Sequence, residues 1–179
     1  MFARTQRLMM RPGWAEDAPA LARAIADERI VRNLANVPWP YDLGEAERYL
    51  AAPRDPVLPS LLLFARTDGD PELVGACALM RKAASGAVVL GYWIARPHWG
   101  RGYATEAGRQ MIEIAETLGL GRLDASYFSD NPASGRVLEK LGFQPTGLKV
   151  PQYSCGRGTK AESVQMRRML GAAPAALAA

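Results

Sequence analysis

Apolar residues follow two spacings along the chain, and these spacings predict its secondary structure. Short runs dominated by apolar residues predict strands. The predicted strands cover residues 7–11, 60–67, 73–81, 87–94, 123–128, 144–149 and 163–169. Apolar residues that recur on one helical face predict helices. The predicted helices cover residues 15–27, 29–35, 42–51, 103–118 and 132–141.

The order of these elements predicts one mixed sheet. Short polar turns at residues 68–71 and 85–86 join three strands, which is typical of an antiparallel meander. The second half alternates strands with helices, which favours a parallel β-α-β crossover. We therefore predict a single α/β (α+β) domain over residues 1–170 with a mixed sheet of about seven strands. Residues 171–179 are expected to form a flexible, Ala-rich tail.

Composition and charge exclude several classes of protein and several kinds of binding site. With 49% apolar and 22% charged residues among 179, the chain can bury a core and is not disordered. A net charge of +4 suits a polyanionic small ligand but is too mild to indicate direct nucleic-acid binding. Two distant cysteines and one histidine exclude a zinc site and a disulfide framework. Neither a membrane span nor an export signal is visible, so we expect a cytoplasmic protein without a membrane partner.

A glycine-rich turn precedes the longest predicted helix. Gly100, Gly102 and Ala104 leave its backbone open to close approach. The first N–H groups of a helix are unpaired and carry partial positive charge, so this turn suits a phosphate. Arg101 could add a charge-assisted contact. The alternative is a tight strand-to-helix connection in which the glycines are needed only for their backbone dihedral angles.

Two other nucleotide-binding motifs fit this turn poorly. A P-loop needs Lys followed by Ser or Thr after the second glycine, where Tyr103 and Ala104 stand. A dinucleotide-binding turn needs Gly or Ala where Thr105 stands. If the turn binds a phosphate, we therefore expect the ligand to be neither a nucleotide held by a P-loop nor a dinucleotide.

Asn131 and Ser134 lie at the start of the next predicted helix. Asn131 suits an N-cap, and Pro132 suits the first helical position, so a capping role explains Asn131 by itself. Both polar side chains also follow the neighbouring strand, where they are well placed to reach a ligand held by the glycine turn.

Three motifs, in order, resemble the GNAT superfamily of acyl-CoA-dependent N-acetyltransferases, and within it the ribosomal-protein N-terminal (alanine/serine) acetyltransferase branch. They are Gly91-Tyr92-Trp93-Ile94, then Trp99-Gly100-Arg101-Gly102-Tyr103-Ala104-Thr105-Glu106-Ala107, then Asn131-x-x-Ser134 followed by Leu141-Gly142-Phe143. The resemblance implies a sheet that splays open at its fourth strand, with acetyl-CoA in the gap. The acetyl-CoA-binding residues that it implies are Trp93, Ile94, Ala95, Arg101, Gly102, Tyr103, Ala104, Thr105, Asn131 and Ser134.

The same resemblance implies direct transfer of an acetyl group from the thioester to a bound primary amine. Ser134 is the candidate general acid for the leaving thiolate, because relatives often place Ser or Tyr there. Trp39 and Tyr41 lie where relatives line the acceptor pocket, although a hydrophobic plug in an irregular loop is an equal interpretation. The resemblance implies no metal, and we expect a monomer or a homodimer.

One position departs from the family pattern. Many relatives carry Glu, the usual base, where Val89 stands. Near neutral pH an α-amine with a pKa near 7.8 is about a quarter neutral, whereas a lysine amine near 10.4 is about 0.1% neutral. A missing base therefore favours a protein or peptide N-terminus as acceptor. Small-molecule amines and a non-catalytic acyl-CoA-binding module are the alternatives.

Overall fold

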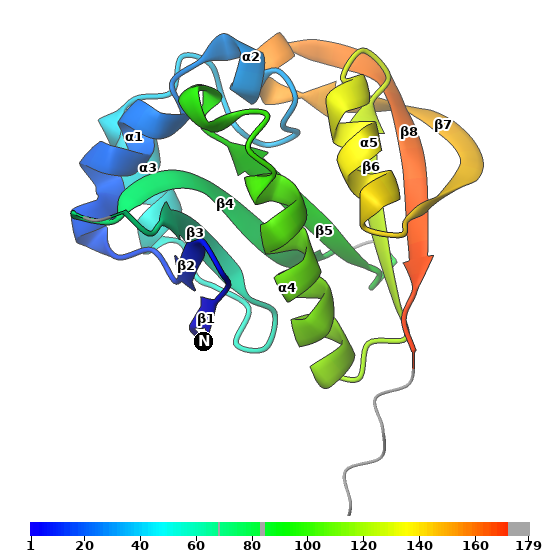
Figure 1. Cartoon of the computed structure of the whole chain (residues 1–179). Coiled ribbons are helices and arrows are strands. Elements are labelled where there is room, and N and C mark those ends of the chain that lie inside the picture. Colours follow the sequence, from blue (N-terminus) through cyan, green and yellow to red (C-terminus); the bar gives the residue numbers. More distant parts are fainter. Residues whose placement is uncertain (68, 83–84, 172–179) are drawn as a thin grey trace, which may run out of the picture.

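The computed structural model describes residues 1–67, 69–82 and 85–171, which form one mixed sheet flanked by helices (Figure 1). The strands are β1 (Ala3–Arg4), β2 (Leu8–Arg11), β3 (Ser60–Ala65), β4 (Glu72–Arg81), β5 (Val88–Ile94), β6 (Arg122–Phe128), β7 (Gln144–Ser154) and β8 (Thr159–Met169). The α-helices are α1 (Ala18–Ile25), α2 (Glu28–Val31), α3 (Leu43–Ala51), α4 (Tyr103–Thr117) and α5 (Pro132–Lys140). None of the helices in these ranges is long and apolar enough to cross a membrane.

The sheet topology confirms the predicted meander and crossover. The strand order is β1-β2-β3-β4-β5-β6-β8-β7. Strands β2 to β5 pair antiparallel with their neighbours, whereas β5 and β6 pair parallel across the α4 crossover. Strand β8 returns between β6 and β7 and pairs antiparallel with both.

The structure corrects several predicted boundaries. The helix expected at residues 15–27 is a 3₁₀ turn (Ala15–Asp17) followed by α1, and the helix expected at 29–35 is the single turn α2. An eighth strand, β1, has two residues and is too short to leave an apolar pattern. Strands β7 and β8 are longer than expected, because Gly147 and Pro151 interrupt the apolar pattern inside β7 and mostly polar residues form the start of β8. Residues 172–179 of the predicted tail and Asp68 of the predicted turn lie outside the described residues.

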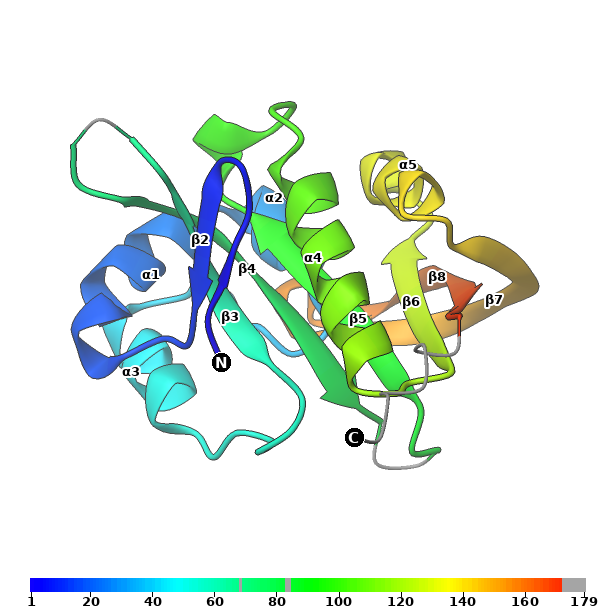
Figure 2. The ribbon, with the colours of Figure 1, turned by 60° about the horizontal axis from the view of Figure 1, so that its bottom comes forward.

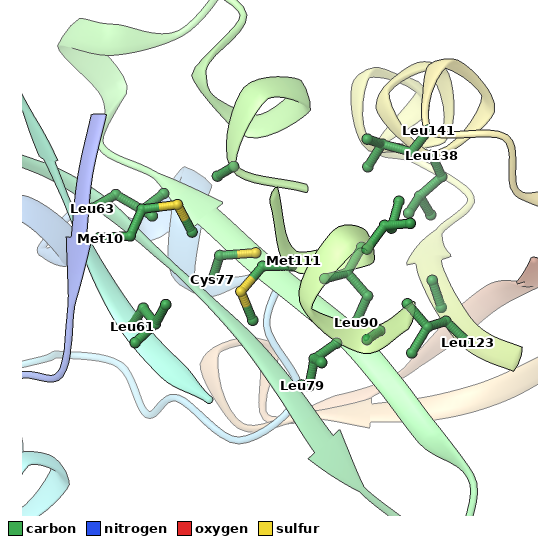
Figure 3. Close-up of a cluster of buried hydrophobic side chains, with 14 of the residues drawn as sticks. Met10, Leu61, Leu63, Cys77, Leu79, Leu90, Met111, Leu123, Leu138 and Leu141 are labelled. Carbon is green, nitrogen blue, oxygen red and sulfur yellow. The ribbon is translucent and has the colours of Figure 1, made fainter. Parts of the chain in front are cut away.

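Helices cover both faces of the sheet, as the alternation along β3 requires. Leu61 and Leu63 belong to a cluster with Met111 of α4, part of which Figure 3 shows. Leu62 and Phe64 belong to the opposite cluster, which includes side chains of α1 and α3. Burial of each large apolar side chain contributes about 1.5–3 kcal/mol, so the two clusters hold the sheet rigidly between its helices.

The sheet opens between β5 and β6. Among the described residues, Val89 and Asp124 are the single register pair between these strands. Beyond this pair, β5 continues to Ile94 and β6 to Phe128. Figure 2 shows the two strands diverging, with α4 over β5 and α5 beside β6. The splayed sheet implied by the family resemblance is therefore present.

Candidate active site

A cavity of about 500 Å³ occupies the opening between β5 and β6. One part of its wall comes from the glycine turn and α4, including Gly102 and Tyr103. Ser134 of α5 lines it as well. The other part comes from α2 and the residues that follow it, including Ile30 and Asn33. The cavity therefore reaches both faces of the sheet, and two ligands could meet in it from opposite sides.

The glycine turn presents open backbone at the start of α4. Gly100 and Gly102 have φ values of +75° and +81°, and Gly102 is the N-cap residue of α4. Most other residue types are strained in this left-handed region, which Asn and Asp tolerate best among them. A Cβ added at Gly100 would meet nothing within 4 Å, so the space above the turn is open. With the unpaired N–H groups of the helix start, this turn fits an anionic phosphate.

The N-terminal hairpin holds this turn in place. Arg7 Nη1 donates a 2.9 Å hydrogen bond to the carbonyl of Arg101. The Glu106 carboxylate in the first turn of α4 accepts hydrogen bonds from Thr5 Oγ1, at 2.6 Å, and Arg7 Nε, at 2.7 Å. The carboxylate of Glu106 thus has a structural role in addition to its favourable place at the helix N-terminus.

The backbone of β5 turns polar groups toward the opening. Ala95 N–H donates to the Val74 carbonyl at 2.8 Å, so it faces away from the opening. Because backbone groups alternate along a strand, those of Tyr92 and Ile94 point to the β6 side. The 2.7 Å hydrogen bond from Trp99 Nε1 to the Ile94 carbonyl agrees with this orientation.

Ser134 lies within hydrogen-bond distance of a partly buried tyrosine, Tyr92. Tyr92 Oη is 2.8 Å from Ser134 Oγ and donates to the Ser134 carbonyl at 3.2 Å. Burial raises the pKa of Tyr92 to about 12, so its hydroxyl stays protonated near neutral pH. The Asn131 side chain accepts a 3.4 Å hydrogen bond from Ser134 N–H and caps α5. Asn131 therefore orients the helix turn that carries Ser134.

The wall on the α2 side of the cavity is assembled from distant parts of the chain. Asn33 and Ile30 line it beside Trp93 of β5. Ser126 of β6 donates a 3.3 Å hydrogen bond to Gln152 of β7, and both line the cavity. No Asp or Glu is among the described residues that line it. The wall therefore provides amide, hydroxyl and aromatic groups together with the guanidinium of Arg29, and the described lining includes the imidazole of His98 but no carboxylate base.

The tip of the β7–β8 hairpin braces this wall. Ser154 Oγ donates a 2.8 Å hydrogen bond to the Leu34 carbonyl. Arg157 Nε donates to the Arg32 carbonyl at 2.6 Å. The side chain of Arg157 is 10% exposed. The position of the segment after α2 thus depends on residues more than a hundred positions later in the chain.

The cavity gathers most of the site residues expected from the sequence. Those that line it are Trp93, Ile94, Gly102, Tyr103, Ala104, Thr105, Asn131 and Ser134. Ala95 faces β4, and Arg101 is exposed with its carbonyl bonded to Arg7. Trp39 and Tyr41 are not among the lining residues; Trp39 is 41% exposed and Tyr41 packs beside Trp93.

Sequence reasoning missed two features of the site. It did not pair Tyr92 with Ser134, although the alternation along β5 places Tyr92 on the same face as Leu90 and Ile94. It also did not find Asn33 and Gln152, which belong to no local motif and meet only in the folded chain.

Comparison with known proteins identifies the family. A family model described as an acetyltransferase (GNAT) domain matches residues 7–144. The chain belongs to the GNAT acetyltransferase family. An uncharacterized N-acetyltransferase of Bacillus licheniformis, p20, is 30% identical over 151 residues, which cover 80% of this chain and 83% of that protein.

Two solved structures share the GNAT fold of this chain. The ribosomal-protein-S5-alanine acetyltransferase of Vibrio fischeri is 15% identical, with a TM-score of 0.77 over 97% of this chain and 99% of that one. The spermidine N-acetyltransferase of Vibrio cholerae, solved with CoA and spermine, is 18% identical, with a TM-score of 0.75 over 92% and 96%. This GNAT chain is thus an acyltransferase whose fold is shared by enzymes named for different acceptors.

Proposed function

We propose that this GNAT enzyme transfers the acetyl group of acetyl-CoA to the α-amine of a protein or peptide N-terminus. The observation that carries the proposal is the phosphate-compatible glycine turn of α4 opening into the gap between β5 and β6. Arg136 and Lys140 of α5 line the same cavity and suit the negative charge of a nucleotide. The structural relative from Vibrio cholerae was solved with CoA.

We assign the steps of the reaction to different groups of the chain. Acetyl-CoA supplies an activated acetyl group as a thioester. The N–H groups of Tyr92 and Ile94 face the gap and suit stabilisation of negative charge that develops on the carbonyl oxygen. The amine nitrogen forms a bond to the acetyl carbon as the carbon–sulfur bond breaks, and the amine loses its proton to solvent. Ser134 then gives a proton to the leaving thiolate and recovers one from solvent.

Tyr92 positions Ser134 for that proton transfer. Tyr92 Oη has a single hydrogen, which it can donate to Ser134 Oγ, 2.8 Å away, in place of the Ser134 carbonyl. In that arrangement the hydrogen of the serine hydroxyl remains available to the thiolate. The raised pKa of Tyr92 keeps this donor protonated. Tyr92 is therefore a positioning residue, and Ser134 is the proton donor.

The chemistry of the cavity supports an α-amine as acceptor. Val89 lines the cavity, and no carboxylate is found among its described lining residues. An enzyme without a carboxylate base can use the neutral fraction of its substrate, which near neutral pH is about a quarter for an α-amine and about 0.1% for a lysine amine. A polyamine would also lack an acidic partner in this cavity.

A peptide that carries one free α-amine and one internal lysine tests this proposal. We expect tandem mass spectrometry to locate the acetyl group on the α-amine. The kcat/KM should rise with pH and level off above about 8, because the neutral amine reacts. Acetylation of the lysine, or turnover only with small amines, would contradict the choice of acceptor. Acetyl-CoA binding without turnover on any amine would instead indicate a non-catalytic binding module.

A further inference from the structure

Arginines flank the acceptor-side mouth of the cavity at both ends of α2. Before α2, Asp27 lies between two of them: its carboxylate is 3.1 Å from Arg29 Nε and 3.7 Å from Arg96 Nη1. Arg96 lies two residues beyond the end of β5, and Arg29 lines the cavity. This triad connects the start of α2 to one side of the sheet opening.

A second triad lies at the other end of α2. The Asp130 carboxylate is 2.7 Å from Arg157 Nη1 and 3.0 Å from Arg32 Nη2. Asp130 follows the end of β6 and precedes Asn131, which lines the cavity. This triad connects α2 to the opposite side of the opening.

Each triad carries a net positive charge. The hydrogen bond from Arg29 holds the pKa of Asp27 below its usual range, and the hydrogen bond from Arg157 does the same for Asp130. Both carboxylates are therefore ionised near neutral pH. Two guanidinium groups against one carboxylate leave each triad with an excess of one positive charge. The exposed Glu28 on α2 offsets one of these two charges, and the described cavity lining adds no further acid, so the mouth keeps a net positive charge.

We propose that the acceptor is an acidic peptide N-terminus, with carboxylate side chains in the first residues after its α-amine. This inference rests on the proposed function and specifies its substrate. The side chains of Arg29, Arg32 and Arg96 are about half exposed, at 55%, 46% and 52%, so they can turn toward carboxylates on an incoming chain.

The same positive charge assists the chemistry. Like charges nearby disfavour the ammonium form of a bound amine and lower its pKa. A larger share of the α-amine is then neutral without a catalytic base. A basic peptide or a polyamine would be repelled by the same groups.

Three peptides of equal length and equal first residue test this inference. Positions two to four carry Asp in the first peptide, Asn in the second and Lys in the third. We expect kcat/KM to fall in that order, by about tenfold from Asp to Lys, with a smaller ratio at higher ionic strength. Equal rates for the three peptides, or a preference for Lys, would overturn the inference while leaving N-terminal acetylation intact.

Variants connect this preference to the triads. The double variant Arg29→Gln/Arg32→Gln should reduce the Asp-to-Lys ratio to near unity, whereas Arg29→Lys/Arg32→Lys should retain most of it. Arg122→Gln is the matched control, because Arg122 is exposed at the start of β6, at the opposite end from Asp130. An unchanged ratio in the Gln double variant, or an equal loss in the control, would contradict the assignment.

A panel of small amines separates this inference from the proposed function. If the enzyme acetylated acidic amino acids but none of the peptides, this result would contradict a peptide N-terminus as acceptor and would support the preference for acidic acceptors. Turnover of polyamines would overturn the charge preference. Both proposals expect little or no turnover of these small amines, and an absence of turnover with the peptides as well would contradict both.

Discussion

The wall of the cavity on the α4–α5 side comes from two short stretches of chain, whereas the wall on the α2 side comes from segments far apart in sequence. The first consists of the turn and first residues of α4 and one face of α5. In the second, the hairpin tip fixes the segment after α2: Cys155 N–H donates to the Ala35 carbonyl at 2.9 Å, and Ser154 Oγ to the Leu34 carbonyl at 2.8 Å.

This difference separates the two binding functions physically. Backbone groups of one turn can hold an acyl donor that is the same in every reaction of the enzyme. Side chains from several elements form the wall on the α2 side, where we propose that the acceptor binds, and this wall can vary without disturbing the turn. Changes near α4 should therefore affect acetyl-CoA binding, and changes near α2 should affect the acceptor. Four substitutions test this separation.

The largest effect is expected at Gly102. Asp and Asn have similar size and both tolerate the left-handed φ of +81°. Gly102→Asp places a negative charge beside the proposed pyrophosphate site and should weaken acetyl-CoA binding by more than about 100-fold, measured by calorimetry. Gly102→Asn should weaken it far less. Similar losses in both variants would mean that the turn does not hold a phosphate.

Ser134→Ala should lower kcat by about 100-fold, because a general acid is lost. Its acetyl-CoA dissociation constant should change little. The helix cap should survive, since Asn131 accepts from the backbone N–H of residue 134. Steady-state kinetics together with calorimetry measures both quantities, and equal losses in the two would make Ser134 a binding residue only.

Tyr92→Phe should lower kcat by about tenfold, which corresponds to one hydrogen bond that orients the donor. The KM for the peptide should stay near the wild-type value. Tyr127→Phe is the matched control, because Tyr127 lines the same cavity from β6. If Tyr92→Phe raised kcat, the serine hydroxyl would instead donate to Tyr92 in the resting enzyme and be released by the substitution.

The smallest effect is expected at Arg157, on the acceptor side. Arg157→Ala removes the bonds to Asp130 and to the Arg32 carbonyl. The lost hydrogen bonds leave this wall less well ordered, and we expect this to weaken peptide binding by about 1 kcal/mol. That free energy corresponds to about a fivefold rise in the peptide KM. The acetyl-CoA dissociation constant should not change. A loss of acetyl-CoA binding in this variant would show that the two walls are not independent.

The same contrast explains how much could be predicted from the sequence. Periodicity predicted the meander, the crossover and the turn before α4, because each of these depends on local spacing. Three motifs in order indicated the family. The long β7–β8 hairpin was not predicted, since Gly147 and Pro151 interrupt its apolar pattern.

Residues that meet only through tertiary structure were missed. Arg32 and Asp130 are separated by 98 positions, and no spacing rule connects them. Tyr92 and Ser134 are separated by 42 positions, although strand alternation and the helix start could have indicated that they face each other. The roles of Trp39 and Tyr41 in acceptor binding stay predictions.

Thermal unfolding with acetyl-CoA, with NAD as the control ligand, tests most directly whether the opening between β5 and β6 is an acyl-CoA site. A ligand at 100 times its dissociation constant stabilises the folded state by about 2.7 kcal/mol. For a chain of this size we expect Tm to rise by roughly 5–10 °C with acetyl-CoA and to stay unchanged with NAD. An unchanged Tm with saturating acetyl-CoA, or a rise with NAD alone, would contradict the assignment of the cavity.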